Sequence, residues 1–171
     1  GTIVIIVLAM TMLILGIVLI RSIFTGSIYN VNTLNDKVKG EINKLFVEDT
    51  RAGVYLQGGI AEIPQGEQWG VAFAIQNNVA TQKFKWVVQT ADSNIRSKCG
   101  ITDAQAEKWI TTGGDGSASI ASGQKYYDTV RFNIPEGEVS DISTCIIRFQ
   151  LIINKEDNTN YMTVPFDVQV Q

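Results

Sequence analysis

The longest apolar stretch of the chain lies over residues 2 to 20. Only Thr2, Thr11 and Gly16 interrupt its apolar side chains, and every charged residue lies at Arg21 or later. A helix of this length is about 28 Å long, close to the hydrocarbon thickness of a bilayer. The pattern therefore predicts a helix that can cross a membrane or pack among other apolar helices.

Beyond Arg21 the pattern becomes that of an amphipathic helix. Apolar residues recur mainly at spacings of three and four, with polar and charged residues between them, which is typical of a helix with one buried face. The recurring positions are Phe24, Ile28, Val31, Val38, Ile42 and Leu45. We expect one helix from residue 2 to about residue 46, which can bend at Gly16, Gly26 or Gly40 because glycine weakens a helix by about 1 kcal/mol.

From residue 49 onward the chain has the pattern of a β-protein. Short runs rich in β-branched and aromatic residues, several alternating apolar with polar as in residues 130–134, are separated by turn residues. They predict about six to eight strands. We therefore expect an α+β fold, in which a long N-terminal hydrophobic α-helix is followed by an antiparallel immunoglobulin-like β-sandwich. The helical domain covers residues 1–48, apolar over 1–20 and amphipathic over 21–48, and the sandwich covers residues 49–171.

Two segments of the second domain depart from the strand pattern. Residues 103–109 predict a short helix. Residues 113–123 are mostly glycine, serine and alanine, which predicts a long exposed loop. This segment lacks the Gly-Lys-Ser/Thr ending of a phosphate-binding loop, so a nucleotide site is not expected there.

Composition and charge narrow the function. The chain has 171 residues, 45% of them hydrophobic, a net charge of −3 and no polybasic run. Nucleic-acid-binding proteins need a basic face to neutralise phosphates. Nucleic acid is therefore not expected as a partner.

Two cysteines are present, Cys99 in an expected loop and Cys145 in an expected strand. In an exported sandwich such a pair is most simply a disulfide. Closing a loop of about 45 residues would stabilise the fold by roughly 3 to 5 kcal/mol on the chain-entropy model. The alternative is two unpaired thiols, with Cys145 filling a place in the core.

Catalytic and cofactor chemistry finds little support. The chain contains no histidine, which removes Ser-His-Asp and Cys-His nucleophiles and most zinc, copper and haem sites. The acidic turn at residues 156–160 lacks the EF-hand arrangement, so a hairpin tip is favoured over a calcium site. Core or rim packing is favoured over sugar binding for Trp69, Trp86 and Trp109. We expect neither an enzyme nor a bound cofactor or metal.

An uncharged apolar segment over residues 1–20, followed by an amphipathic helix and then a β-sandwich, resembles archaeal type IV pilins and the related archaellum subunits. Bacterial pilins carry a glutamate at the fifth mature position, where this chain has Ile5. That difference favours the archaeal branch. Archaellin tips tend to be rich in alanine, whereas this one has Ala9 alone, which favours a pilus over a motility filament.

The resemblance implies a structural subunit of an extracellular filament used for adhesion or surface attachment. The chain would enter the cytoplasmic membrane and be processed by a prepilin peptidase, because ordinary signal peptidase would remove the apolar segment. An ATP-driven pilus assembly machinery would then add it to a helical homopolymer. The side chains expected to pack in the filament core are Ile3, Ile6, Leu8, Leu13, Ile17, Ile20, Phe24, Ile28 and Val31.

Two other functions fit parts of the pattern. In a single-pass membrane-anchored extracellular binding module, the same helix would stay in the lipid and the immunoglobulin-like domain would bind a ligand. An exported enzyme or electron-transfer accessory would need site residues that the sequence does not offer.

Overall fold

In the computed structural model, residues 1–27, 34–46 and 50–171 are described, with the backbone alone for residues 16–27 and for Gln57. The chain divides into two compact units, Gly1–Asn30 and Val31–Gln171. This division falls earlier than the boundary expected after residue 48. Helix α1 (Thr2–Ser27) makes up the first unit, and helix α2 (Asp36–Asn43) belongs to the second.

The prediction of one continuous helix to residue 46 is wrong at Asn35. This residue has an extended backbone, and its side chain accepts a hydrogen bond from the backbone N–H of Val38 at 2.9 Å. Asparagine in that conformation starts a new helix, because its side-chain oxygen satisfies one of the first free N–H groups. The amphipathic segment beyond residue 35 is therefore a separate helix.

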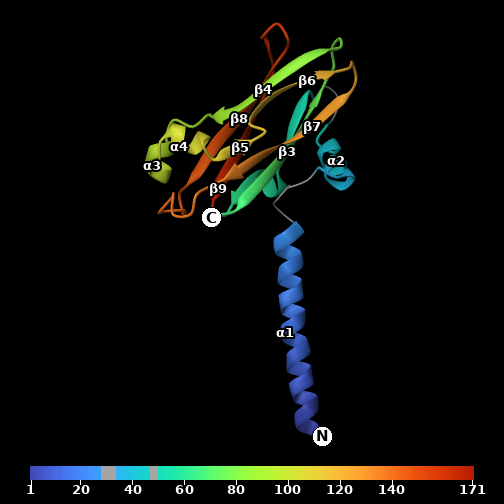
Figure 1. Cartoon of the computed structure of the whole chain (residues 1–171), viewed down its shortest axis with the longest axis vertical. Coiled ribbons are helices and arrows are strands. Elements are labelled where there is room, and N and C mark those ends of the chain that lie inside the picture. The colour runs from blue at the N-terminus through green and yellow to red at the C-terminus, as the bar shows by residue number, and fades with distance from the viewer. Residues whose placement is uncertain (28–33, 47–49) are drawn as a thin grey trace. The chain divides into compact units, whose positions relative to one another are not determined.

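The described residues form nine strands in two sheets (Figure 1). The four-stranded sheet has the order β1 (Ala52–Tyr55), β3 (Gln68–Gln76), β7 (Lys125–Asn133) and β5 (Ile110–Thr112). The five-stranded sheet has the order β2 (Ile60–Ile63), β9 (Asn160–Val170), β8 (Ile146–Asn154), β4 (Gln82–Thr90) and β6 (Asp115–Ile120). The short helical segments are η1 (Gln57–Gly59), α3 (Ile95–Cys99) and α4 (Asp103–Glu107).

Strand pairing is antiparallel except between β2 and β9, which run parallel. Parallel neighbours cannot be joined by a tight hairpin. β2 comes early in the domain and β9 ends it, so this pair brings the two ends of the domain's sequence together. The expected immunoglobulin-like β-sandwich is confirmed, with this one parallel pair added.

The core lies between the two sheets and follows the alternation of the strands. In β8, for example, Ile147, Phe149, Leu151 and Ile153 are all buried. Phe132 of β7 meets Phe149 edge to face, with ring centroids 5.4 Å apart, so aromatic contacts join the sheets. Alternating burial of this kind is what a two-layer sandwich requires.

β3 differs from the other strands because it is buried on both faces. Trp69, Val71, Phe73 and Ile75 point into the core, whereas Ala72 and Ala74 belong to a second apolar cluster under α2. Alanine side chains on that outer face allow a helix to pack closely against the strand. β3 is therefore covered by a sheet on one side and by a helix on the other.

The expected loop over residues 113–123 is wrong over residues 115–120, which form β6. This strand pairs with β4, and Gly116 lies opposite Trp86. A side chain at Gly116 would overlap the indole ring of Trp86. The small residues thus reflect a close approach between strands and not a loose loop. The short helix expected at residues 103–109 is confirmed as α4, which Thr102 and Gln105 cap reciprocally.

Candidate functional site

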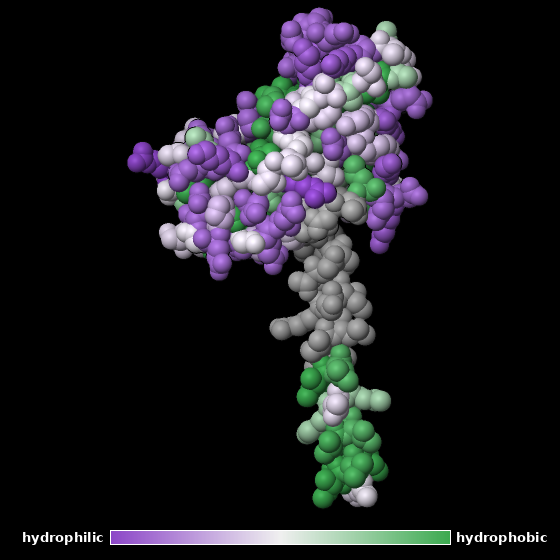
Figure 2. Space-filling view, viewed as in Figure 1, coloured by the Kyte–Doolittle hydropathy of each residue, from purple (hydrophilic) through white to green (hydrophobic). Residues whose placement is uncertain are grey.

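The surface of α1 is the most unusual feature of the chain. Each large apolar side chain between Ile3 and Leu15 is exposed, from 51% at Ile6 to 79% at Ile3. Figure 2 shows this surface as apolar, in contrast with the largely polar surface of the sandwich. Soluble proteins rarely leave so large an apolar surface uncovered.

The hydroxyl of Thr11 is satisfied within α1. The hydroxyl of Thr11 donates a 2.8 Å hydrogen bond to the carbonyl oxygen of Val7. No charged side chain occurs over residues 2–20. The surface around Thr11 can therefore enter an apolar environment without burying a charged side chain or leaving that hydroxyl unpaired.

The residues expected in a filament core fall into three groups. Ile3, Ile6, Leu8 and Leu13 are exposed on α1. Ile17, Ile20 and Phe24 lie on the same helix, but their side chains are outside the described part of the chain. Ile28 and Val31 lie outside the described residues altogether. Their packing against other subunits stays a prediction.

Over the residues that the structure describes, no helix is both long enough and apolar enough to span a membrane. The expected membrane helix over residues 2–20 includes positions 16–20, whose side chains lie outside that description.

α2 covers its apolar face within its own unit. Ile42 is fully buried against Ala72 and Ala74 of β3, and Val38 and Phe46 pack around it. Polar contacts secure its C-terminal end. The side-chain oxygen of Asn43 accepts hydrogen bonds from the hydroxyl of Tyr127 at 2.6 Å and from the amino group of Lys125 at 3.0 Å.

Cations add to this contact, since Lys39 lies over the ring of Tyr127 and Lys125 over that of Phe46. Sequence reasoning missed this docked helix. The Asn35-Asp36 pair and the small residues on alternate positions of β3 were the signals that could have found it.

The expected disulfide joins Cys99 to Cys145, with Cα atoms 4.7 Å apart. The pairing is confirmed, although Cys99 ends helix α3 and Cys145 lies just before β8, where a loop and a strand were expected. Both cysteines are buried. A disulfide of this kind is typical of proteins outside the cytoplasm.

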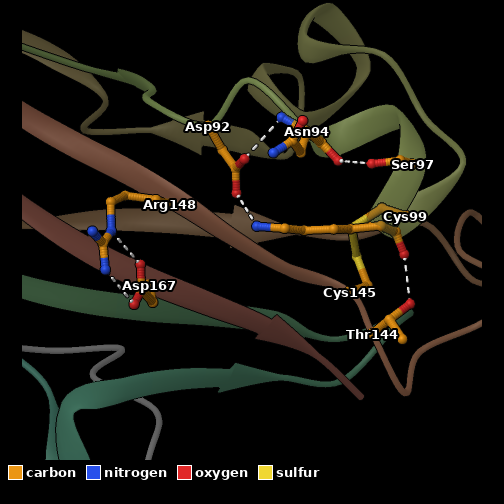
Figure 3. Close-up of polar contacts among 9 residues, drawn as sticks. Asp92, Asn94, Ser97, Cys99, Thr144, Cys145, Arg148 and Asp167 are labelled. Atoms are coloured by element: carbon orange, nitrogen blue, oxygen red, sulfur yellow. Dashed lines mark hydrogen bonds and ion pairs between the residues drawn. A yellow bond between two sulfur atoms is a disulfide. The ribbon is translucent and has the colours of Figure 1, made fainter.

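Charged residues beside the disulfide are paired with one another (Figure 3). Lys98 donates to Asp92 at 2.7 Å, and this hydrogen bond lowers the pKa of the Asp92 carboxyl below its usual value. Arg148 of β8 makes two hydrogen bonds to Asp167 of β9, at 2.8 and 3.0 Å. These residues line a hollow of about 350 Å³, but their charges are already engaged by each other.

The residues of the other candidate sites have structural roles in packing and in a turn. Trp69, Trp86 and Trp109 are 6%, 5% and 1% exposed, as expected for core residues. The acidic turn at residues 156–160 connects β8 to β9, and Asp157 accepts hydrogen bonds from the backbone and hydroxyl of Thr159. Among the described residues, no three acidic or cysteine side chains gather closely enough to hold a metal ion.

Comparison with known proteins finds distant likenesses among solved structures. No protein-family model and no curated protein sequence matches the chain. The periplasmic chaperone SfaE is similar in structure, at 12% identity and a TM-score of 0.43, over 70% of this chain and 56% of the chaperone. The chain thus spans little more than half the length of that protein.

Two further solved structures are similar at lower TM-scores. Self-complemented MyfA, the major subunit of Myf fimbriae from Yersinia enterocolitica, matches at 9% identity and a TM-score of 0.29, over 63% of this chain and 85% of MyfA. A Niemann-Pick type C2 protein from the Japanese carpenter ant matches at 9% identity and 0.37, over 71% and 90% of the two chains. These distant likenesses concern the fold and assign no function.

Proposed function

We propose that the chain is the structural subunit of an extracellular pilus-like helical filament, of the kind built by archaeal type IV pilins. The observation that carries the proposal is the uncovered apolar surface of α1. Fully burying one large aliphatic side chain is worth roughly 1.5 to 3 kcal/mol against water. A helix with such side chains on every face needs an apolar environment on every face.

Other copies of the same helix supply that environment in a filament. A subunit whose neighbours bind it head to tail forms an open helical polymer when the contacts do not close into a ring. The sandwich has its own core, so it does not need α1 to fold and can occupy the outside of the polymer. The disulfide supports a location outside the cytoplasm.

In this proposal the subunit does not drive its own assembly. The chain has no catalytic role and no cofactor, and its partners are other subunits, the membrane before assembly, a prepilin peptidase and the assembly machinery. Lipid is already apolar, so transfer from the bilayer to the filament gains little from burial alone. Close helix packing and external work have to drive the transfer.

The test is electron microscopy of material sheared from the source cells, with mass spectrometry to find this chain in any fibres. Fibres made of this chain are the expected result. Cells producing the Ile6→Asp variant should lose them, because a carboxylate on α1 cannot enter an apolar helix bundle without a large desolvation cost.

Abundant normal fibres in that variant would contradict the proposal. Recovery of the unaltered chain only from detergent-extracted membranes would favour the anchored binding module instead.

A further inference from the structure

A cavity of about 550 Å³ opens on the sandwich beside strands β6 and β7. We call it the β6–β7 cavity. This volume is within the range of small-molecule sites, which run from roughly 300 to 1,000 Å³. Its lining is largely polar, and the side chains that matter for its chemistry are Trp86, Asp115, Ser117, Tyr126, Asp128 and Arg131.

The cavity exists because strand pairing on this side of the sandwich is incomplete. β5 pairs only with Arg131 and Phe132 of β7, whereas β3 pairs with β7 along its whole length. In the described residues, β6 is the outermost strand of its sheet and pairs only with β4. A stretch of β7 and the outer side of β6 therefore border the cavity in place of another strand.

Two glycine residues in the cavity wall make close contacts that a side chain would prevent. A side chain at Gly116 would overlap the Cε2–Cζ2 edge of the Trp86 ring, and one at Gly113 would overlap the backbone oxygen of Thr129. Gly113 also has a positive φ of 76°, a conformation that glycine adopts without strain. Backbone at Gly116 thus lies directly against the indole edge that includes the carbon bonded to Nε1.

The Trp86 indole forms part of this wall and holds an unpaired N–H group buried behind it. The side chain is 5% exposed, and none of the described residues accepts a hydrogen bond from its Nε1. Buried N–H groups are nearly always paired, because leaving one unpaired is costly. Trp86 lines the β6–β7 cavity, but its Nε1 is fully buried. A ligand held in the cavity therefore contacts the indole ring, and reaches the N–H only if the backbone at Gly116 moves aside.

The remaining groups present hydroxyls, carboxylates and an aromatic face together. The rings of Tyr126 and Trp86 are tilted by 37° with centroids 5.2 Å apart. The Tyr126 hydroxyl donates to Asp128 at 3.2 Å, and burial together with that carboxylate raises the pKa of Tyr126. Asp115 and Ser117 are exposed along β6. Two carboxylates against one guanidinium, that of Arg131, make the lining unfavourable for an anion.

We propose that the β6–β7 cavity binds a neutral pyranose unit of a glycan. A pyranose combines C–H faces that pack on aromatic rings with hydroxyl groups that donate to carboxylates and exchange hydrogen bonds with a hydroxyl such as that of Ser117. An apolar ligand would leave the polar lining unpaired, and an acidic sugar would face Asp115 and Asp128. An adhesive role for the β6–β7 cavity rests on the proposed filament function, whereas sugar binding itself does not require filament assembly.

The experiment uses the full chain in micelles of a zwitterionic detergent that contains no sugar. The indole N–H signals of the three tryptophans are followed by NMR during titration with the methyl pyranosides of galactose, glucose and mannose, and the Trp86 signal is assigned with the Trp86→Phe variant. At least one of these sugars should shift the Trp86 signal in a saturable way. The Trp109 signal is the internal control, because its Nε1 is equally buried and unpaired but does not line the cavity.

Matched variants then test the lining. Asp115→Asn and Asp128→Asn should each weaken sugar binding by about tenfold or more, because hydrogen bonds to charged groups are the strong ones. Asp157→Asn, on the turn between β8 and β9, should leave the affinity unchanged. Asp115 is exposed on an outer strand, so its variant keeps the test valid even if Asp128→Asn fails to fold.

Three outcomes would overturn the proposal: no neutral sugar shifts the Trp86 signal, the shift is the same in both variants, or N-acetylneuraminic acid binds in preference. Because the chain is held in micelles, the result is independent of polymerisation. If the chain binds the sugar but forms no fibres on cells, the binding site stands and the filament proposal is contradicted. If it forms fibres but binds no sugar, the filament proposal stands and the binding site is contradicted.

Discussion

The two N-terminal helices differ in the exposure of their apolar side chains. In α1, Ile3 and Leu13 are 79% and 66% exposed, whereas in α2, Ile42 is fully buried. The sequences differ accordingly, since residues 2–20 carry no charge and α2 reads DKVKGEIN. A helix with one apolar face finds its partner within the domain, as α2 does on β3. A helix that is apolar on all sides needs more partners than one sandwich offers.

The strongest test of this contrast places the same charge in both helices. Ile42→Asp should lower the free energy of unfolding by about 5 kcal/mol, because it removes a buried side chain and places a carboxylate in its position. Leu13→Asp should change that free energy by less than about 0.5 kcal/mol, since the side chain is exposed in the single chain. Urea denaturation followed by tryptophan fluorescence measures this well, because all three tryptophans are buried in the sandwich.

Filament assembly should be lost in the α1 variant, whose stability is expected to change little. Leu13→Asp should abolish fibres while leaving the fluorescence transition in place. If the two variants lost equal stability, the two helices would not differ in whether their apolar side chains pack within the single chain.

A second test acts on the sandwich unit alone. Replacing Cys99 and Cys145 together by alanine should lower its free energy of unfolding by about 4 kcal/mol, given a separation of 46 residues, because the unfolded chain loses a closed loop. The urea midpoint of the variant should match that of the unaltered chain in reductant. A midpoint that reductant does not move would mean that the disulfide contributes little to the unit's stability.

The smallest expected effect is a pH dependence. Lys98 lowers the pKa of Asp92 in the folded state, so the pair stabilises above the ordinary aspartate pKa of about 3.9 and this contribution is lost as the pH falls through the lower folded value. Its size should be at most about 1 kcal/mol. Residues 2–20 contain no titratable side chain, so the effect belongs to the sandwich unit.

Asp92→Asn should flatten this part of the stability curve in urea denaturation at a series of pH values. Lys98→Met should have a similar effect. An unchanged slope in both variants would rule out this pair as its source.

Much of the fold could be predicted because periodicity is a local property. The apolar run gave α1, and alternation gave most of the strands and the sandwich. Pairing between distant segments is not local, which is why the docking of α2 on β3 and the parallel pairing of β2 with β9 were missed. Asn35 shows the limit well, since a cap and a tertiary contact together override a helical pattern that would otherwise continue.

The candidate site was only partly visible in the sequence. Exposed apolar positions on α1 followed from composition alone, and Cys99 and Cys145 could be paired by elimination. The β6–β7 cavity could not be predicted, because the glycine-rich segment that borders it has the composition of a loop. Its small residues are explained by the backbone's contact with Trp86, which depends on how β4 and β6 pair.

The packing of α2 against β3 also has a mechanical consequence. Along the chain, α2 stands between α1 and the first strand of the sandwich, so tension between an anchored α1 and a load on the sandwich passes through it. Its contacts are side-chain packing and the hydrogen bonds of Asn43, whereas Cys99 and Cys145 are joined covalently farther along. In the proposed filament, a pull along the chain would therefore act first on these non-covalent contacts between α2 and β3, while the covalent link between Cys99 and Cys145 would stay closed.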